Sequence, residues 1–230
     1  MSVLTREAEG SIVGRLRVRY AGVALLLSAG IPVGIGASAI FVVLLASIVV
    51  HERFPRVQAP DWLLAAIIIV LTFSTSVAFA FVTAAARDEQ PVWWRTLLVG
   101  ATLPLAGAAA LLVVAARLEP LGSSRADLTL PIFRLSFVSA SALIAFSCTL
   151  VSGWLFRVPG TPRRALAVAA ITAVVYLVVA LALDPIPGFH VGGGDRAMPK
   201  VTALCNFIAG IVGGAAALRA LSAQSKRVPT

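Results

Sequence analysis

Charged residues are scarce in this chain: Asp, Glu, Lys and Arg together make up 13% of its 230 residues. Soluble globular domains carry roughly 25% charged residues, whereas this chain is 59% hydrophobic. Several of its apolar runs contain about twenty residues, which is enough for an α-helix to cross a ~30 Å hydrocarbon core. The scarcity of charge therefore excludes an ordinary soluble domain and predicts an integral membrane protein.

Charge is also missing from the interior of the apolar runs. Arg95 and Arg134 fall within about a turn of predicted span ends, where a long side chain reaches the interface. An ionisable group at mid-membrane usually marks a pathway or site, so its absence argues against proton-coupled transport and carboxylate-based catalysis. Two cysteines are too few for a disulfide framework. Because Cys148 and Cys205 both lie inside apolar runs, we interpret them as small packing residues.

The chain has only two histidines, as many as cysteines, and both histidines fall in predicted outer loops. His51 and His190, with Asp184, are the candidate metal ligands, since imidazole plus carboxylate is a reasonable ligand set. Glu52 and Asp195 lie in the same loops. These residues have no motif spacing, and solvated interfacial residues would give the same pattern. A serine or cysteine nucleophile would also need a nearby base, and these histidines are far from the mid-membrane hydroxyls.

What the chain has in abundance is apolar sequence, in six runs that predict six transmembrane helices at about residues 28–50, 62–86, 93–116, 132–156, 165–183 and 201–221. They form one membrane domain, residues 20–221. A basic surface segment (1–19) precedes this domain, and a polar tail (222–230) follows it. The predicted fold class is an all-α integral membrane protein, a bundle of about six transmembrane helices.

The net charge of +9 is explained by the position of the basic residues beside the apolar runs, where they set topology. With six spans, twelve Lys and Arg fall on the side of both termini and seven on the other side. The positive-inside rule then places both termini in the cytoplasm of a multi-pass cell-membrane protein. No basic helix or aromatic-interleaved motif supports nucleic-acid binding.

Small residues recur at intervals of three and four along three of the runs, which lets neighbouring backbones approach closely in a membrane. The last run has the clearest such face, in which Gly210 and Gly214 form a small-xxx-small pair. The candidate helix-packing residues are Gly30, Gly34, Ser38, Ser141, Cys148, Ser152, Asn206, Gly210 and Gly214.

Hydroxyl side chains gather in the second and fourth runs, as in Thr72, Ser74, Thr75 and Ser76. Three interpretations stay open. The hydroxyls bond between helices, they bond back to carbonyls of their own helix, or they line a path for a substrate.

Three stretches occur in a familiar order: GIGASAIFVVLLASIVVHERFP (34–55), LTFSTSVAFAFVTAAARDEQPVWWRTLLVGATL (71–103) and LPIFRLSFVSASALIAFSCTLVSGWLFR (130–157). Residues 34–183 thereby resemble subunit III of the haem-copper (cytochrome c) oxidases. The resemblance implies a membrane subunit that holds lipid or supports a larger complex. The family's intramembrane glutamates have no counterpart here, since Ala39 and other small residues occupy those places. No functional residue is therefore carried over.

Packing faces, an uncharged interior and the lack of a soluble domain favour an accessory or scaffolding subunit of a larger membrane complex, such as a respiratory one. The alternative is the permease subunit of a transporter such as an ATP-driven exporter, to which six spans with both termini inside are suited. A third reading is a haem- or metal-binding enzyme that uses the outer histidines. No motif implies a cofactor or a catalytic activity. The expected partners are the lipid bilayer and either other membrane subunits or further copies of the chain.

Overall fold

The computed structural model describes residues 30–31, 33–36, 38–39, 61–87, 89–90, 92–118, 126–186 and 197–222. Residues 1–19, most of the first apolar run, and residues 223–230 of the polar tail lie outside this part of the chain. Within it, all regular structure is helical. The long helices are α3 (Asp61–Ala86), α4 (Trp93–Leu118), α5 (Ala126–Leu155), α6 (Thr161–Leu183) and α7 (Ala197–Ser222).

Four of these helices, α3, α5, α6 and α7, are long and apolar enough to cross a membrane. Their outward faces carry large apolar side chains that a soluble protein would not expose together, for example Val70, Leu135, Leu166 and Val178. In lipid, every backbone N–H and C=O must be bonded internally, which favours continuous helices. The prediction of an all-α membrane protein is confirmed, but the structure identifies four candidate spans among the described residues, where the sequence predicts six.

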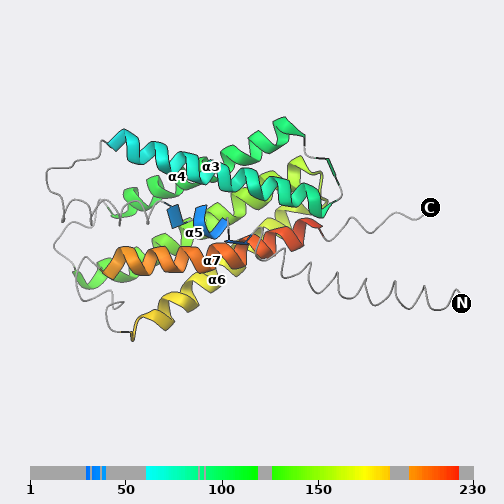
Figure 1. Ribbon diagram of the computed structural model, residues 1–230. Coiled ribbons are helices and arrows are strands. Elements are labelled where there is room, and N and C mark those ends of the chain that lie inside the picture. The colour runs from blue at the N-terminus through cyan, green and yellow to red at the C-terminus, as the bar shows by residue number, and fades with distance from the viewer. Residues whose placement is uncertain are drawn as a thin grey trace, which may run out of the picture.

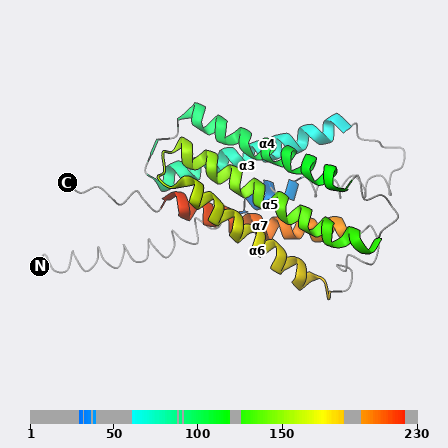
Figure 2. The same ribbon diagram turned by 180° about the vertical axis from the view of Figure 1, so that it is seen from behind.

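Helices that follow one another in the sequence pack side by side, and α7 returns to contact α3, α5 and α6. Figures 1 and 2 show α3 and α4 on one side of the bundle, α6 and α7 on the other, and α5 between them. The described residues of the 30–39 stretch, called here the N-terminal segment, pack between α3 and α4 on one side and α7 on the other. The result is an elongated bundle whose long helices run from end to end.

A tight turn holds α5 and α6 together. The amide of Val158 donates to the carbonyl of Gly153, and the amide of Arg157 donates to that of Trp154. With Arg157 at φ 52°, these bonds form a Schellman motif, which satisfies the last carbonyls of α5. Gly160 also has a positive φ, and Pro162 follows at the start of α6, where its missing N–H costs nothing.

The most enclosed helix is α7. In the apolar part of α7, 56% of residues are buried, against 22–28% in α3, α5 and α6. Its small residues explain the difference, because a glycine-rich surface can be approached from several sides at once. The N-terminal segment uses this property, since Gly34 lies directly against Gly210. Of these four helices, α7 is therefore the most closely packed.

Candidate functional site

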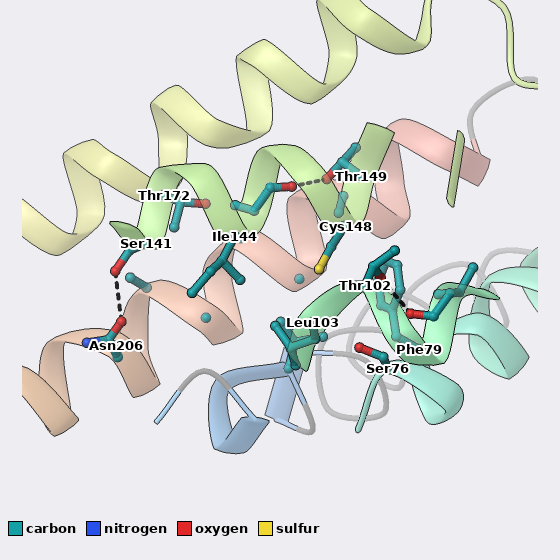
Figure 3. Close-up of a pocket in the computed structure, with 18 residues that line it drawn as sticks. Ser76, Phe79, Thr102, Leu103, Ser141, Ile144, Cys148, Thr149, Thr172 and Asn206 are labelled. Atoms are coloured by element: carbon teal, nitrogen blue, oxygen red, sulfur yellow. Dashed lines mark hydrogen bonds between the residues drawn. The ribbon is translucent and has the colours of Figure 1, made fainter. Parts of the chain in front are cut away.

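A cavity lies inside the bundle, where α3 to α7 and the N-terminal segment meet (Figure 3). A water-sized sphere can occupy about 40 Å³ of it. Its wall is mostly apolar or glycine, and the face of small residues on α7 supplies one side. The polar members of the lining are Ser76, Thr102, Ser141, Cys148, Thr149, Thr172 and Asn206.

One hydrogen bond crosses between helices at the cavity wall. The Ser141 hydroxyl of α5 donates to Oδ1 of Asn206 on α7, with an O···O distance of 2.7 Å. The Asn206 amide nitrogen in turn donates to the Thr202 carbonyl, one turn earlier in α7. Because both side chains are buried, the pair fixes how α5 and α7 face one another. The sequence places Ser141 and Asn206 on packing faces, and the structure brings them together.

Unlike Ser141, the threonine hydroxyls at the cavity donate their protons within their own helices. The hydroxyls of Thr149 and Thr172 each donate to the carbonyl four residues earlier in their own helix, at 2.7 Å and 2.8 Å. Thr102 bonds the carbonyl three residues earlier. In the part of α3 that the sequence singles out, Thr72 and Thr75 do the same. Of the three interpretations of the hydroxyl-rich runs, bonding within a helix describes the threonines, and bonding between helices describes Ser141.

Two further polar groups lie at the cavity. Ser76 is 4% exposed and forms part of the cavity wall on the α3 side. Across the cavity, the Cys148 thiol points toward Thr102 and lies within hydrogen-bonding reach of its hydroxyl (Figure 3). Cys205, by contrast, is fully buried and does not contribute to the cavity. Residue spacing does not predict that Ser76 and Cys148 line the same cavity, because they lie on different helices, α3 and α5.

Close backbone contact supports the cavity from the side of the N-terminal segment. A Cβ placed on Gly210 would lie 2.6 Å from the Gly34 Cα, and a Cβ on Gly34 would lie 2.6 Å from the Phe207 carbonyl oxygen. Gly30 faces the Ile211 carbonyl in the same way. Ser38 donates to the Ala203 carbonyl at 3.0 Å. This helix crossing therefore admits only glycine at its closest point.

At one end of the bundle, two arginines bind the last turn of α7. Arg87, just after α3, donates to the Leu221 carbonyl at 2.9 Å and pairs with Glu89 at 2.8 Å. Arg164, in the first turn of α6, donates to the Ala220 carbonyl. Cations are favourable at a helix C-terminus, where carbonyls lack partners within the helix. We call Arg87 and Arg164 the arginine clamp; the sequence indicated only that they are basic residues near span ends.

The remaining predicted residues that the structure describes, Ser152 and Asp184, lie apart from the cavity. Ser152 is fully buried, and its Oγ has no hydrogen-bond partner among the described residues. Asp184 pairs with Arg134 of α5 at 2.6 Å, which ties the end of α6 to the start of α5. His51 and His190 lie outside the described residues. Within the part of the chain that the structure describes, no three His, Cys, Asp or Glu side chains gather closely enough to hold a metal ion.

The chemistry of the cavity is that of neutral hydroxyl, amide and thiol groups. Its described lining holds no ionisable acid or base other than the Cys148 thiol, so the described groups offer no general base that would activate a serine or threonine. The groups can form hydrogen bonds and fill space. No family model matches the chain, and neither a curated protein nor a solved structure matches it.

The Ser141–Asn206 bond is open to a double-mutant cycle. We expect Ser141→Ala and Asn206→Ala to destabilise the protein individually and to show a coupling free energy of about 0.6–1.7 kcal/mol, the range of hydrogen bonds between membrane helices. The measurement is reversible unfolding in mixed micelles. Ser139→Ala is the matched control, because Ser139 bonds to the Leu135 carbonyl of its own helix. A coupling energy of zero would contradict the bond.

Proposed function

We propose that this chain is an accessory or scaffolding subunit of a larger membrane complex, such as a respiratory one. The observation that carries the proposal is how the interior polar groups are used. The threonine hydroxyls donate to carbonyls of their own helices, and Ser141 donates to Asn206. These interior polar groups therefore stabilise the bundle. The broad apolar faces of α3 to α6 remain available to lipid or to neighbouring subunits.

The proposal includes six spans in a cell membrane. α4 has 26 residues, about 39 Å at 1.5 Å per residue, and it packs between α3 and α5. The described helical residues of the N-terminal segment belong to the first predicted span, 28–50. Trp93, Trp94 and Trp154 are exposed at helix ends, which suits an interfacial belt.

Orientation follows from the charges of the described residues. Among the described residues, the bundle end with the arginine clamp carries six arginines and one glutamate: Arg87, Arg95, Arg157, Arg163, Arg164, Arg219 and Glu89. The described residues of the opposite end include three basic and three acidic ones: Arg117, Arg134, Lys200, Asp61, Asp127 and Asp184. By the positive-inside rule the clamp end faces the cytoplasm, on the same side as both termini.

The decisive experiment is quantitative mass spectrometry of the proteins that copurify with the tagged chain from its native membrane in mild detergent. We expect other membrane subunits in fixed ratio to this chain, and oxidase subunits among them would fit the resemblance to subunit III. A single ATPase partner would instead identify an exporter permease. Isolation alone or as a homo-oligomer would contradict the scaffolding role, and a Soret band in the purified sample would indicate a haem protein.

A further inference from the structure

We propose that the cavity is a binding site for small apolar molecules that dissolve in the bilayer, such as a short hydrocarbon. The inference concerns the interior of the bundle and does not rest on the scaffolding role. By the volume measure given above, one water-sized position takes about 10–15 Å³. The ~40 Å³ of the cavity therefore has room for an occupant of about three non-hydrogen atoms.

The surface that the cavity presents to an occupant is almost wholly apolar, although several polar residues contribute to its wall. Internal hydrogen bonds explain the difference. Thr102, Thr149 and Thr172 donate their protons to carbonyls of their own helices. Ser141 donates to Asn206. Water in a cavity needs about two to four polar partners, and apolar cavities stay dry, so the wall favours an apolar occupant over water.

The composition of α7 keeps this space open. Most of its side of the wall consists of glycine and alanine: Ala209, Gly210, Gly213, Gly214 and Ala217. Side chains this short cannot reach across the cavity to fill it. The close contact of Gly210 with Gly34 and the bond from Ser141 to Asn206 hold α7 against its neighbours. The lining of an empty space lacks dispersion contacts on one side, and an occupant restores them.

The bilayer is the source of the occupant, and the size of the cavity selects small molecules from it. Lipid tails are as apolar as the wall, so transfer from lipid brings no hydrophobic gain. A solute in lipid must open a space between the tails, whereas the cavity is already open and its close-packed wall offers dispersion contacts. A whole acyl chain is far longer than a space for about three atoms. A charged molecule is excluded because the described wall has no opposite charge to compensate for its desolvation.

Xenon is the probe, because it is a single apolar atom that binds in apolar protein cavities. The measurement is the ¹³C shift of isoleucine δ1 methyl groups in detergent micelles at increasing xenon pressure. Ile144 lines the cavity on α5 (Figure 3), whereas Ile171 is exposed on α6 and reports xenon dissolved in the detergent. We expect the shift of Ile144 to saturate and that of Ile171 to stay linear. Linear shifts at both would mean that the cavity is closed or already filled, and would overturn the proposal.

Filling the cavity tests whether it holds the saturating site. Ala145→Val adds two carbons at the wall, and we expect it to weaken xenon binding at Ile144 by roughly tenfold or more. Ala109→Val makes the same change at an exposed position of α4 outside the described lining and should leave the affinity within about twofold. Cys148→Leu fills the cavity from the next turn of α5 and serves if Ala145→Val does not fold. Unchanged binding in a folded, filled variant would place xenon elsewhere and overturn the proposal.

Discussion

Gly210→Leu is expected to separate the N-terminal segment from α7 and to destabilise the bundle by about 3 kcal/mol or more, the upper end of the range for overpacking. The reason is the distance of 2.6 Å from a Cβ at this position to the Gly34 Cα. The obstructing atoms are backbone and cannot rotate away, so an entire helix must shift. The effect is measured by thermal unfolding in detergent, with loss of the monodisperse peak as the readout.

The matched control is Ala109→Leu, a leucine at an exposed position of α4, which should change stability by no more than about 0.5 kcal/mol. Gly34→Leu tests the same contact from the other helix and should resemble Gly210→Leu. The two substitutions share one contact, so the double variant should cost less than the sum of the single variants. If Gly210→Leu were as stable as the control, the close crossing would be wrong.

The positions of the helices follow from the sequence because lipid leaves few alternatives. A long uncharged run must be helical in a membrane, and α3 to α7 lie over the apolar runs from residue 61 onward. The small face of α7 was also visible in the sequence, since a spacing of three and four residues fixes what lies on one side of a helix. It gathers Asn206, Gly210 and Gly214 along the cavity wall.

Partners across the bundle were not predictable in the same way. The pairing of Ser141 with Asn206 and the proximity of Ser76 to Cys148 depend on helix rotations that periodicity leaves open. The bonds of the threonines to their own helices carried a local signal that was available, because a threonine hydroxyl can reach the carbonyl one turn earlier. The roles of Arg87 and Arg164 were not predictable from the sequence, because they depend on where the C-terminal end of α7 lies in the bundle.

Removal of the arginine clamp is the second large effect that we expect. Arg87→Ala with Arg164→Ala should destabilise the protein by about 2–3 kcal/mol, since hydrogen bonds to charged groups contribute about 1.5–3 kcal/mol each and partial exposure reduces their value. The loss has three sources. The carbonyls of Ala220 and Leu221 lose cationic donors, the ends of α3 and α7 lose their link, and Glu89 loses its partner.

Arg163→Ala separates the clamp from the general charge of this end of the bundle. Arg163 is adjacent to Arg164 but exposed, so its removal takes away one of the two positive charges lost in the double variant without breaking either bond to α7. We expect a change within about 0.5 kcal/mol, as for most surface substitutions. Because the clamp bonds are partly buried, the cost of removing them should also persist at 1 M salt, where the Debye length is about 3 Å. An equal loss in Arg163→Ala, or a loss that disappears in salt, would mean that the arginines act as surface charge and that α7 ends without a clamp.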